Sequence, residues 1–382
     1  MLGGAVVVFI SGQISIPDAM GAINTDVMLF LFGMFVVGEA MVESGYLSLL
    51  SCRFFSHART PDQLIFFILF GMGLFSAVLM NDTLAIIGTP LVLSLATKFR
   101  ISPKLMLLSL AIAVTTGSVM SPIGNPQNLL IAVNSGMGTP FVTFGLYLLV
   151  PTLISLGLAY VLLRLFFRRE FSPRPIVQDT VQSVEHTIIL PVQCSLAIIL
   201  TLAAANITAS FFGGKILVPL PFIALCAAIP VLLVGKNPVR LIKNIDWPTL
   251  VFFASMFVLM ESVWQTGFFQ AFVDRNMVTS LPMVLMTSAV LSQFISNVPF
   301  VALFQPMILQ AGGTSAQLMA LAAGSTIAGN LTILGAASTV IIIQNAEKQG
   351  QTLTFFEFAK IGIPLTTLQL LVYWAWLSFL PF

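Results

Sequence analysis

Short polar interruptions break long apolar stretches of this chain, and they form two matching pairs. In the first half they lie at residues 81–83 and 121–128, and in the second half at residues 296–299 and 329–339. Such backbone is tolerated at membrane depth only where it is buried in protein or lines a water-filled cavity. Interruptions at corresponding places of two halves indicate that a binding site lies between the halves.

The composition is that of a protein embedded in a lipid bilayer. Of the 382 residues, 58% are hydrophobic and only 8% are charged, whereas a soluble domain typically carries about 25% charged residues. The apolar runs are continuous rather than alternating, which predicts helices instead of the strands of a membrane β-barrel. The few basic residues lie in loops, and the net charge of +2 gives no reason to expect a nucleic acid partner.

The apolar segments predict an all-α polytopic membrane protein. They fall at residues 3–20, 27–50, 63–97, 104–133, 141–167, 187–208, 216–235, 247–266, 280–311, 317–345 and 361–381. In the broken segment 63–97, the arm from Thr83 to Lys98 would reach about 24 Å as a helix, less than the hydrocarbon core of about 30 Å. We therefore expect a re-entrant hairpin here and at 280–311, each followed by a broken transmembrane helix.

The positions of the basic residues predict the topology. All of the 16 Lys and Arg except Lys215 and Arg275 fall in loops that share one side of the membrane, provided that each hairpin returns to the side it entered from. Basic loops mark the cytoplasmic side. We therefore expect the N-terminus and the central linker to be cytoplasmic and the C-terminus to be outside. The two hairpins then enter the membrane from opposite sides.

The two halves share landmarks in the same order, which predicts two inverted-topology repeats. The matching positions are Asp26 with Asp246, residues 34–36 with 256–258, Glu39 with Glu261, Asn81 with Asn297, Pro90 with Pro306, Gly124 with Gly335, and Asn128 with Thr339. We assign residues 1–167 to the first inverted repeat, 168–186 to a cytoplasmic linker and 187–382 to the second inverted repeat. The first repeat looks one helix shorter, since one apolar segment precedes Asp26 and two precede Asp246.

The interruptions place helix ends in the middle of the membrane. Free carbonyl groups and side-chain oxygens there can coordinate a small cation, and free amides can hold an anion without any Arg or Lys. We expect substrate and ion binding at all the interruptions, by Asn81, Asp82, Thr83, Ser121, Gly124, Asn125, Asn128, Ser296, Asn297, Asn330, Thr332, Gly335, Ser338 and Thr339. The alternative is turn chemistry for the Asn side chains and a simple backbone bend for the Gly residues.

Asp82 is the sharpest candidate, because an acidic residue at membrane depth is costly and marks a functional site by default. It would bind a cation or carry a proton, and Asn81, Asp82 and Asn125 form a candidate sodium site. The alternative is that Asp82 only caps the second hairpin arm as an N-cap residue. Val298 occupies the corresponding place in the second half, so the coupling site should be asymmetric.

Glu39 and Glu261 occupy equivalent places on repeated helices. They are candidates for lining an ion path, because they are acidic and lie within apolar segments. The alternative is that each makes a structural hydrogen bond to a hairpin or to a neighbouring helix.

The interruptions resemble those of the ion transporter superfamily, which includes arsenite-pump permeases, sodium–proton antiporters, citrate permeases and divalent anion–sodium symporters. The resemblance rests on Asn-Asp-Thr at 81–83 with Ser-Pro-Ile-Gly-Asn-Pro-Gln-Asn at 121–128, and on Ser-Asn-Val-Pro at 296–299 with Gly-Asn-Leu-Thr-Ile-Leu-Gly-Ala-Ala-Ser at 329–338. The superfamily's symporters carry Ser-Asn-Thr at each hairpin tip. The Asp variant at the first tip looks closer to the arsenite-pump and antiporter members.

The resemblance implies a secondary active transporter that moves a small anion, an inorganic oxyanion or a carboxylate, by alternating access. The coupling ion would be sodium or a proton, with no other cofactor. Alternatives are an arsenite efflux permease or a sodium–proton antiporter, and more remotely a channel or an intramembrane enzyme. The expected partners are a small anionic or oxyacid substrate, the lipid bilayer and a second copy of the chain. We expect an integral protein of a prokaryotic inner membrane that is not an enzyme.

Overall fold

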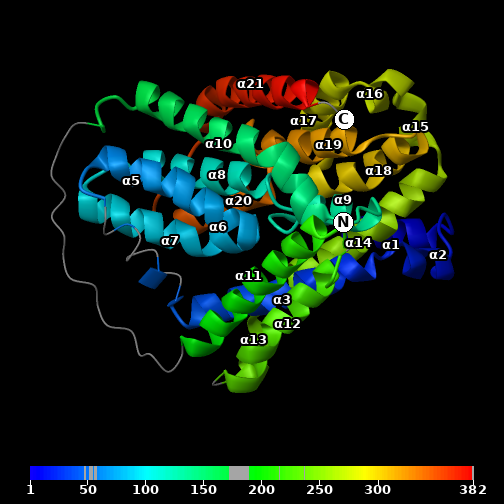
Figure 1. Ribbon diagram of the computed structural model, residues 1–382, viewed down its shortest axis with the longest axis horizontal. Helices are drawn as coiled ribbons and strands as arrows, with labels where there is room; N and C mark the ends of the chain where they lie inside the picture. The colour runs from blue at the N-terminus through cyan, green and yellow to red at the C-terminus, as the bar shows by residue number, and fades with distance from the viewer. Residues whose placement is uncertain are drawn as a thin grey trace.

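The computed structural model describes residues 1–46, 49, 50, 55, 58–171, 189–214, 216–235 and 237–380, and these residues form helices joined by turns (Figure 1). No β-strand occurs within these ranges, which confirms the predicted all-α fold. The predicted linker 168–186 lies outside the described residues from position 172 onward, as do Lys215 and Lys236.

Apart from the first span, the helices of the first half follow the predicted apolar segments. They are α1 (Leu2–Ile10), α2 (Ile16–Ala22), α3 (Thr25–Glu43), α5 (Pro61–Phe67), a π-helical turn η1 (Ile68–Met72), α6 (Gly73–Val78), α7 (Asn81–Phe99), α8 (Pro103–Ser118), α9 (Pro126–Asn134) and α10 (Pro140–Phe166). Pro stands in the first turn of several of them, where its missing N–H costs nothing.

The second half repeats the pattern. Its helices are α11 (Leu190–Phe211), α12 (Leu220–Val234), α13 (Pro238–Asn244), α14 (Trp247–Gln265), α15 (Phe268–Phe272), α16 (Arg275–Thr279), α17 (Leu281–Ile295), α18 (Asn297–Gln310), α19 (Ser315–Ile327), two 3-10 turns η3 (Ala328–Asn330) and η4 (Ile333–Gly335), α20 (Ala337–Glu347) and α21 (Phe355–Phe379). Within the described residues, 7 helical stretches are long and apolar enough to cross a bilayer.

One predicted span is wrong. Residues 3–20 do not form a single helix but the two short helices α1 and α2. The sequence Ser-Gly-Gln-Ile after Ile10 ends the first helix. Ser15 then starts a new helix, because its side chain accepts a hydrogen bond from the Asp18 N–H at 3.2 Å and Pro17 follows in the first turn. A local cap thus overrides an apolar run that is long enough to span a membrane.

Both hairpins and both broken helices are present. The first hairpin runs from α5 through α6, turns after Val78 and returns as α7, and the second consists of α17 and α18 with Ser296 between them. In Figure 1 the first hairpin lies at the left and the second at the right, so the two hairpins point toward each other. The repeats interlock, because α7 packs against α20 of the other half and α18 packs against α9.

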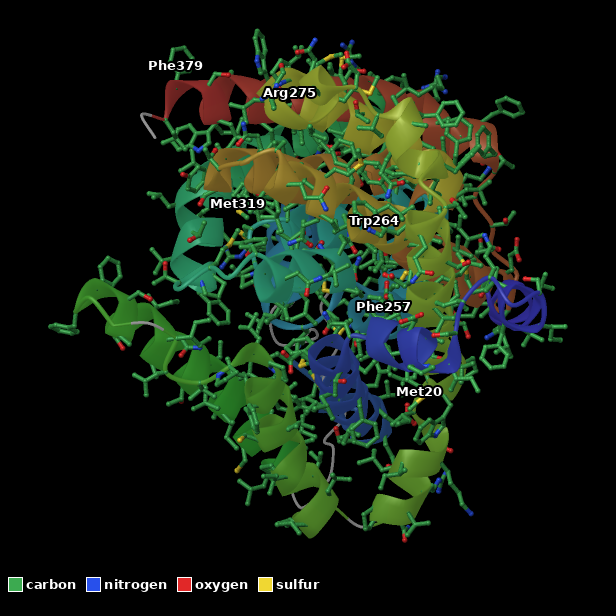
Figure 2. The ribbon with its side chains drawn as sticks, turned by 90° about the vertical axis from the view of Figure 1, so that its right-hand side faces the viewer. Met20, Phe257, Trp264, Arg275, Met319 and Phe379 are labelled. Carbon is green, nitrogen blue, oxygen red and sulfur yellow. The ribbon has the colours of Figure 1, made fainter. Side chains whose placement is uncertain are left out.

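A second group of helices forms a frame beside the hairpins. In it α12 packs along α3 and against α11, while α1 and α2 pack along α14. Figures 1 and 2 show α11, α12 and α13 on the edge of the molecule away from α10 and α21. Those two helices pack together on the other edge, joined by a hydrogen bond of 2.7 Å between the Thr152 and Tyr373 hydroxyls.

Several basic loops meet at one end of the molecule. Lys104 at the start of α8 forms an ion pair with Glu357 in the first turn of α21. The Ser102 N–H donates to a Glu170 carboxylate oxygen at 3.3 Å, which brings the end of α10 to the same loop. Three of the loops that the charge argument places together are therefore in contact, and their cytoplasmic side stays a prediction.

Candidate functional site

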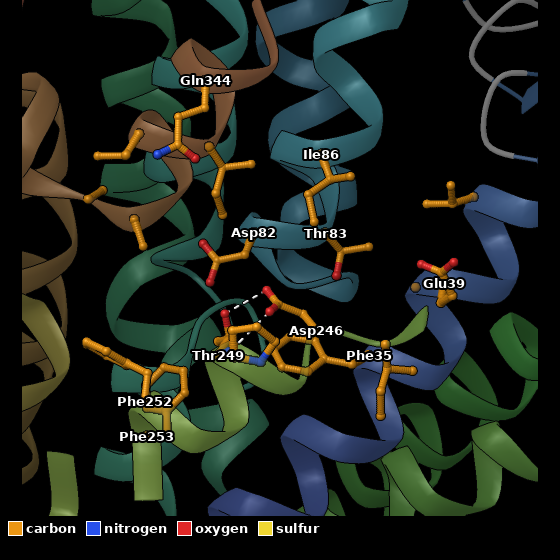
Figure 3. Close-up of a pocket in the computed structure, with 18 of the residues that line it drawn as sticks. Phe35, Glu39, Asp82, Thr83, Ile86, Asp246, Thr249, Phe252, Phe253 and Gln344 are labelled. Atoms are coloured by element: carbon orange, nitrogen blue, oxygen red, sulfur yellow. Dashed lines mark hydrogen bonds between the residues drawn. The ribbon is translucent and has the colours of Figure 1, made fainter. Parts of the chain in front are cut away.

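The main cavity opens where the first hairpin tip, the frame and the second broken helix meet, and its volume is about 630 Å³ (Figure 3). Its lining includes Phe35, Gly38, Glu39 and Val42 of α3, Asp82, Thr83 and Ile86 of α7, Asp246 and Thr249 at the start of α14, Ser296 of the second hairpin turn, and Ala336, Ala337 and Gln344 in and before α20. Both halves of the chain contribute to it, as the matched interruptions predict.

Asp82 lies in the wall of this cavity. Its side chain is 9% exposed, and no hydrogen bond or ion pair joins its carboxylate to any described residue. The N-cap of α7 is Met80, and Asp82 lies inside the first turn. The structure thus gives no support to the alternative that Asp82 is the N-cap residue.

Asp246 lies in the same part of the cavity and comes from the other half. It is the N-cap of α14, where one carboxylate oxygen accepts the Thr249 N–H at 3.1 Å and the other accepts the Thr249 hydroxyl at 2.6 Å. Figure 3 shows the Asp82 carboxylate next to the Asp246 carboxylate, with the Thr83 hydroxyl turned toward Asp246. The sequence marks Asp246 only as a repeat landmark, because its place on the cavity depends on tertiary packing.

The cavity is acidic. Glu39, Asp82 and Asp246 are its ionisable lining residues, and no described Lys, Arg or His lines it. Within the described residues there is no group of three or more His, Cys, Asp and Glu that could hold a metal ion. A cation here would therefore need hydroxyl or amide oxygens beside the carboxylates.

Asn81 joins the first hairpin tip to both broken helices. Its N–H donates to the Gly124 carbonyl at 2.9 Å, and its side-chain amide donates to the Ser338 hydroxyl at 3.5 Å. Its side-chain oxygen accepts the Asp82 N–H at 2.9 Å. The structure thus brings the three predicted site residues Asn81, Gly124 and Ser338 together behind the cavity wall.

Asn125 and Asn128 lie in the first break but do not line the main cavity. The Asn125 amide donates to the Ser118 hydroxyl at 2.9 Å and to Thr326 at 3.3 Å, and its oxygen caps α9 by accepting the Asn128 N–H at 2.8 Å. The Asn128 amide donates to three carbonyls of the break, those of Ser118, Val119 and Ser121. In the structure these side chains hold the break in shape, and ion binding by Asn125 stays a prediction.

Asn330 and Thr332 hold the second break in a similar way. The Asn330 amide donates to the Thr116 hydroxyl at 2.9 Å and to the Gln369 side-chain oxygen at 3.0 Å. The Thr332 hydroxyl donates to Gln293 at 2.8 Å, and Gln293 donates to the Ala328 carbonyl at 2.7 Å. Sequence reasoning misses Gln369 and Gln293, because single Gln residues inside apolar helices carry no pattern.

The remaining predicted residues lie around the same junction. Ser296 lines the main cavity, with a backbone φ of 75° at the turn between α17 and α18. The Asn297 side-chain oxygen and the Thr339 hydroxyl are buried without a hydrogen-bond partner among the described residues. Ser121 and Gly335 are buried in the two breaks.

A second, smaller cavity of about 290 Å³ contains Glu261. Its lining includes Phe257, Met260, Glu261 and Trp264 of α14, which are the repeat counterparts of Phe35, Gly38, Glu39 and Val42 in the main cavity. Figure 2 shows Phe257 and Trp264 on α14. The two predicted ion-path residues therefore lie in two different cavities, and Glu261 also accepts a hydrogen bond from Gln265 at 3.0 Å.

The family of the chain follows from its sequence match. A model of the citrate transporter family, CitMHS, matches residues 1–317. The chain belongs to the citrate transporter family. This confirms the resemblance to the ion transporter superfamily, and it makes the protein an integral membrane transporter rather than an enzyme.

Several transporters are similar to this chain over nearly its whole length. An uncharacterised transporter of Mycobacterium tuberculosis is 25% identical over 94% of this chain and 87% of its own length. The silicon efflux transporter LSI3 of rice is 26% identical over 95% of this chain and 88% of its own length. The crystal structure of the YdaH transporter of Alcanivorax borkumensis, 17% identical, matches the fold with a TM-score of 0.63 over 95% of this chain and 86% of that one.

Proposed function

We propose that this protein is a secondary active transporter that moves a small anion, an inorganic oxyanion or a carboxylate, coupled to sodium or protons by alternating access. The observation that supports the proposal most directly is the position of Asp82. It is an acidic side chain at a helix break, buried, without a partner, in the wall of a cavity built by both halves. An unpaired carboxylate in this place is costly unless it binds a cation or a proton during the cycle.

The cavity can hold an anion without a basic residue. Three helices begin at its wall, namely α7 at Asn81, α18 after Ser296 and α20 at Ala337. The first N–H groups of a helix lack helical partners and carry partial positive charge. An anion between these helix N-termini would sit beside the carboxylates that bind the coupling cation, so that each charge compensates the other.

The two cavities support alternating access. The main cavity and the second cavity use counterpart faces of α3 and α14, and their volumes differ, about 630 Å³ against about 290 Å³. Inverted repeats allow each half to adopt the conformation of the other, which exchanges an open cavity for a closed one. We infer that Glu39 lines the path on one side of the membrane and Glu261 the path on the other.

A second candidate is efflux of an uncharged oxyacid such as arsenite or silicic acid. The acidic lining favours it, because Glu39, Asp82 and Asp246 repel a free anion until cations neutralise them. The name of the rice relative supports the same substrate class. Sodium–proton exchange without another substrate is the third candidate.

The experiment is transport by purified protein in sealed liposomes under an imposed sodium or proton gradient, with citrate, phosphate, silicic acid and arsenite as substrates. Asp82→Asn should lower gradient-driven uptake or release by more than about tenfold, as expected when a charged ligand group is lost. Asp274→Asn, at the exposed N-cap of α16, serves as the matched control and should transport normally. Ion dependence that persists unchanged in Asp82→Asn would remove Asp82 from the mechanism.

A further inference from the structure

The carboxylates of Asp82 and Asp246 share one part of the main cavity although they come from different halves of the chain. Asp82 belongs to the hairpin helix α7, and Asp246 is the N-cap of the frame helix α14. Asp246 is near enough to interact electrostatically with Asp82. The remaining charged groups nearby are Glu39 on α3, and Glu43, whose carboxylate lies 3.8 Å from Arg240. No described basic side chain therefore compensates the two Asp residues inside the cavity.

A third oxygen points to a ligand independently of the acidic pair. The Thr83 side chain is 7% exposed, it lines the cavity, and its hydroxyl makes no hydrogen bond with a described residue. Figure 3 shows this hydroxyl turned into the cavity toward Asp246. The residue is buried but its hydroxyl oxygen is open to the cavity, so a group bound beside the Asp246 carboxylate can take it as a further ligand.

We propose that Asp82, Thr83 and Asp246 bind one sodium-sized cation between them, and that Asp246 supplies the acidic ligand that the second hairpin lacks at Val298. This inference rests on the proposed function, because it identifies the coupling ion and a further ligand of the same site. Two carboxylates and a hydroxyl are hard oxygen ligands, which suit an alkali or alkaline-earth cation. Asn125 is not part of this set, since its amide and oxygen are already bonded within the first break.

The site explains how an ion could control movement. A cation held by all three residues would tie the tip of the first hairpin to α14 of the frame. Its loss would leave two carboxylates facing each other without a counter-charge, and they repel more strongly in a cavity than in bulk water. Cation binding and release would then favour different arrangements of hairpin and frame.

The chain offers a matched control for Asp246. Its repeat counterpart Asp26 lies in the first turn of α3 and lines a different cavity together with Met137 and Leu220.

The substitution Asp246→Asn should keep the helix cap. Asn is as good an N-cap as Asp, so Asp246→Asn should still accept the Thr249 N–H. The variant removes the negative charge and keeps the start of α14.

The test is a thermal-shift titration of purified full-length protein with sodium chloride, at constant ionic strength with choline chloride. A cation that binds only the folded state raises its melting temperature. Sodium should stabilise the wild type. Asp82→Asn and Asp246→Asn should raise the half-saturating sodium concentration by at least about tenfold, the loss expected for a charged ligand. Thr83→Val should raise it by a smaller factor, and Asp26→Asn should leave it unchanged.

Each outcome decides a different claim. If choline and sodium stabilise the wild-type protein equally, the proposed cation site is wrong. If Asp246→Asn binds sodium normally while Asp82→Asn does not, Asp246 is not a ligand of the cation, and the proposed coupling at Asp82 still stands. If both variants lose sodium binding but transport in liposomes needs no sodium, the cation site is supported and sodium-coupled transport is contradicted.

Discussion

At the scale of single residues, Gly124 and Gly335 each lie against a backbone carbonyl in their break and leave no room for a side chain. A Cβ at Gly124 would lie 2.4 Å from the Ser118 carbonyl oxygen, and one at Gly335 would lie 2.6 Å from the Ala328 carbonyl oxygen. Alanine at either position should therefore destabilise the protein by about 1–3 kcal/mol, measured as a lower melting temperature. Gly145→Ala in α10 is the control, since nothing lies within 4 Å of its added Cβ. Full stability of both break variants would contradict the close approach.

At the scale of elements, a buried polar triad ties the second break to its neighbours. Asn330 of η3, Thr116 of α8 and Gln369 of α21 are fully buried and hydrogen-bonded in a closed set, with distances of 2.9, 3.0 and 3.1 Å. Gln369→Leu should cost about 1–3 kcal/mol, because it leaves one buried N–H of the Asn330 amide without its acceptor. We expect a lower melting temperature with an unchanged sodium titration. An altered sodium titration with normal stability would instead place the triad at the ion site.

The elements also show what the sequence can predict. The hairpins and broken helices are predictable because runs of Asn, Gly, Pro and Ser interrupt apolar segments, and that signal is local. The division of 3–20 into two helices depends on the Ser15 cap, which composition hides. The Asn330 triad and the place of Asp246 depend on contacts between residues far apart in the chain, such as Asn330 and Thr116, 214 positions apart. Local patterns therefore locate the breaks, and only the packed structure separates cavity residues from residues that hold the breaks in shape.

At the scale of the whole molecule, the two cavities make alternating access testable with a matched pair of positions. Phe35 and Phe257 are the same residue type at counterpart places, one in each cavity, and their exposed fractions are 8% and 6%. The test replaces the 3 native cysteines by serine and introduces a single cysteine at position 35 or at position 257. The two cysteines should react with a water-soluble thiol reagent at different rates. In the conformation described here Phe35→Cys should react faster, because its cavity is larger. A substrate or ion that favours the opposite conformation should slow Phe35→Cys and speed up Phe257→Cys, because the repeats exchange roles. If the reaction rates at both positions rise together, the two cavities open at the same time. That is the behaviour of a channel and not of a transporter.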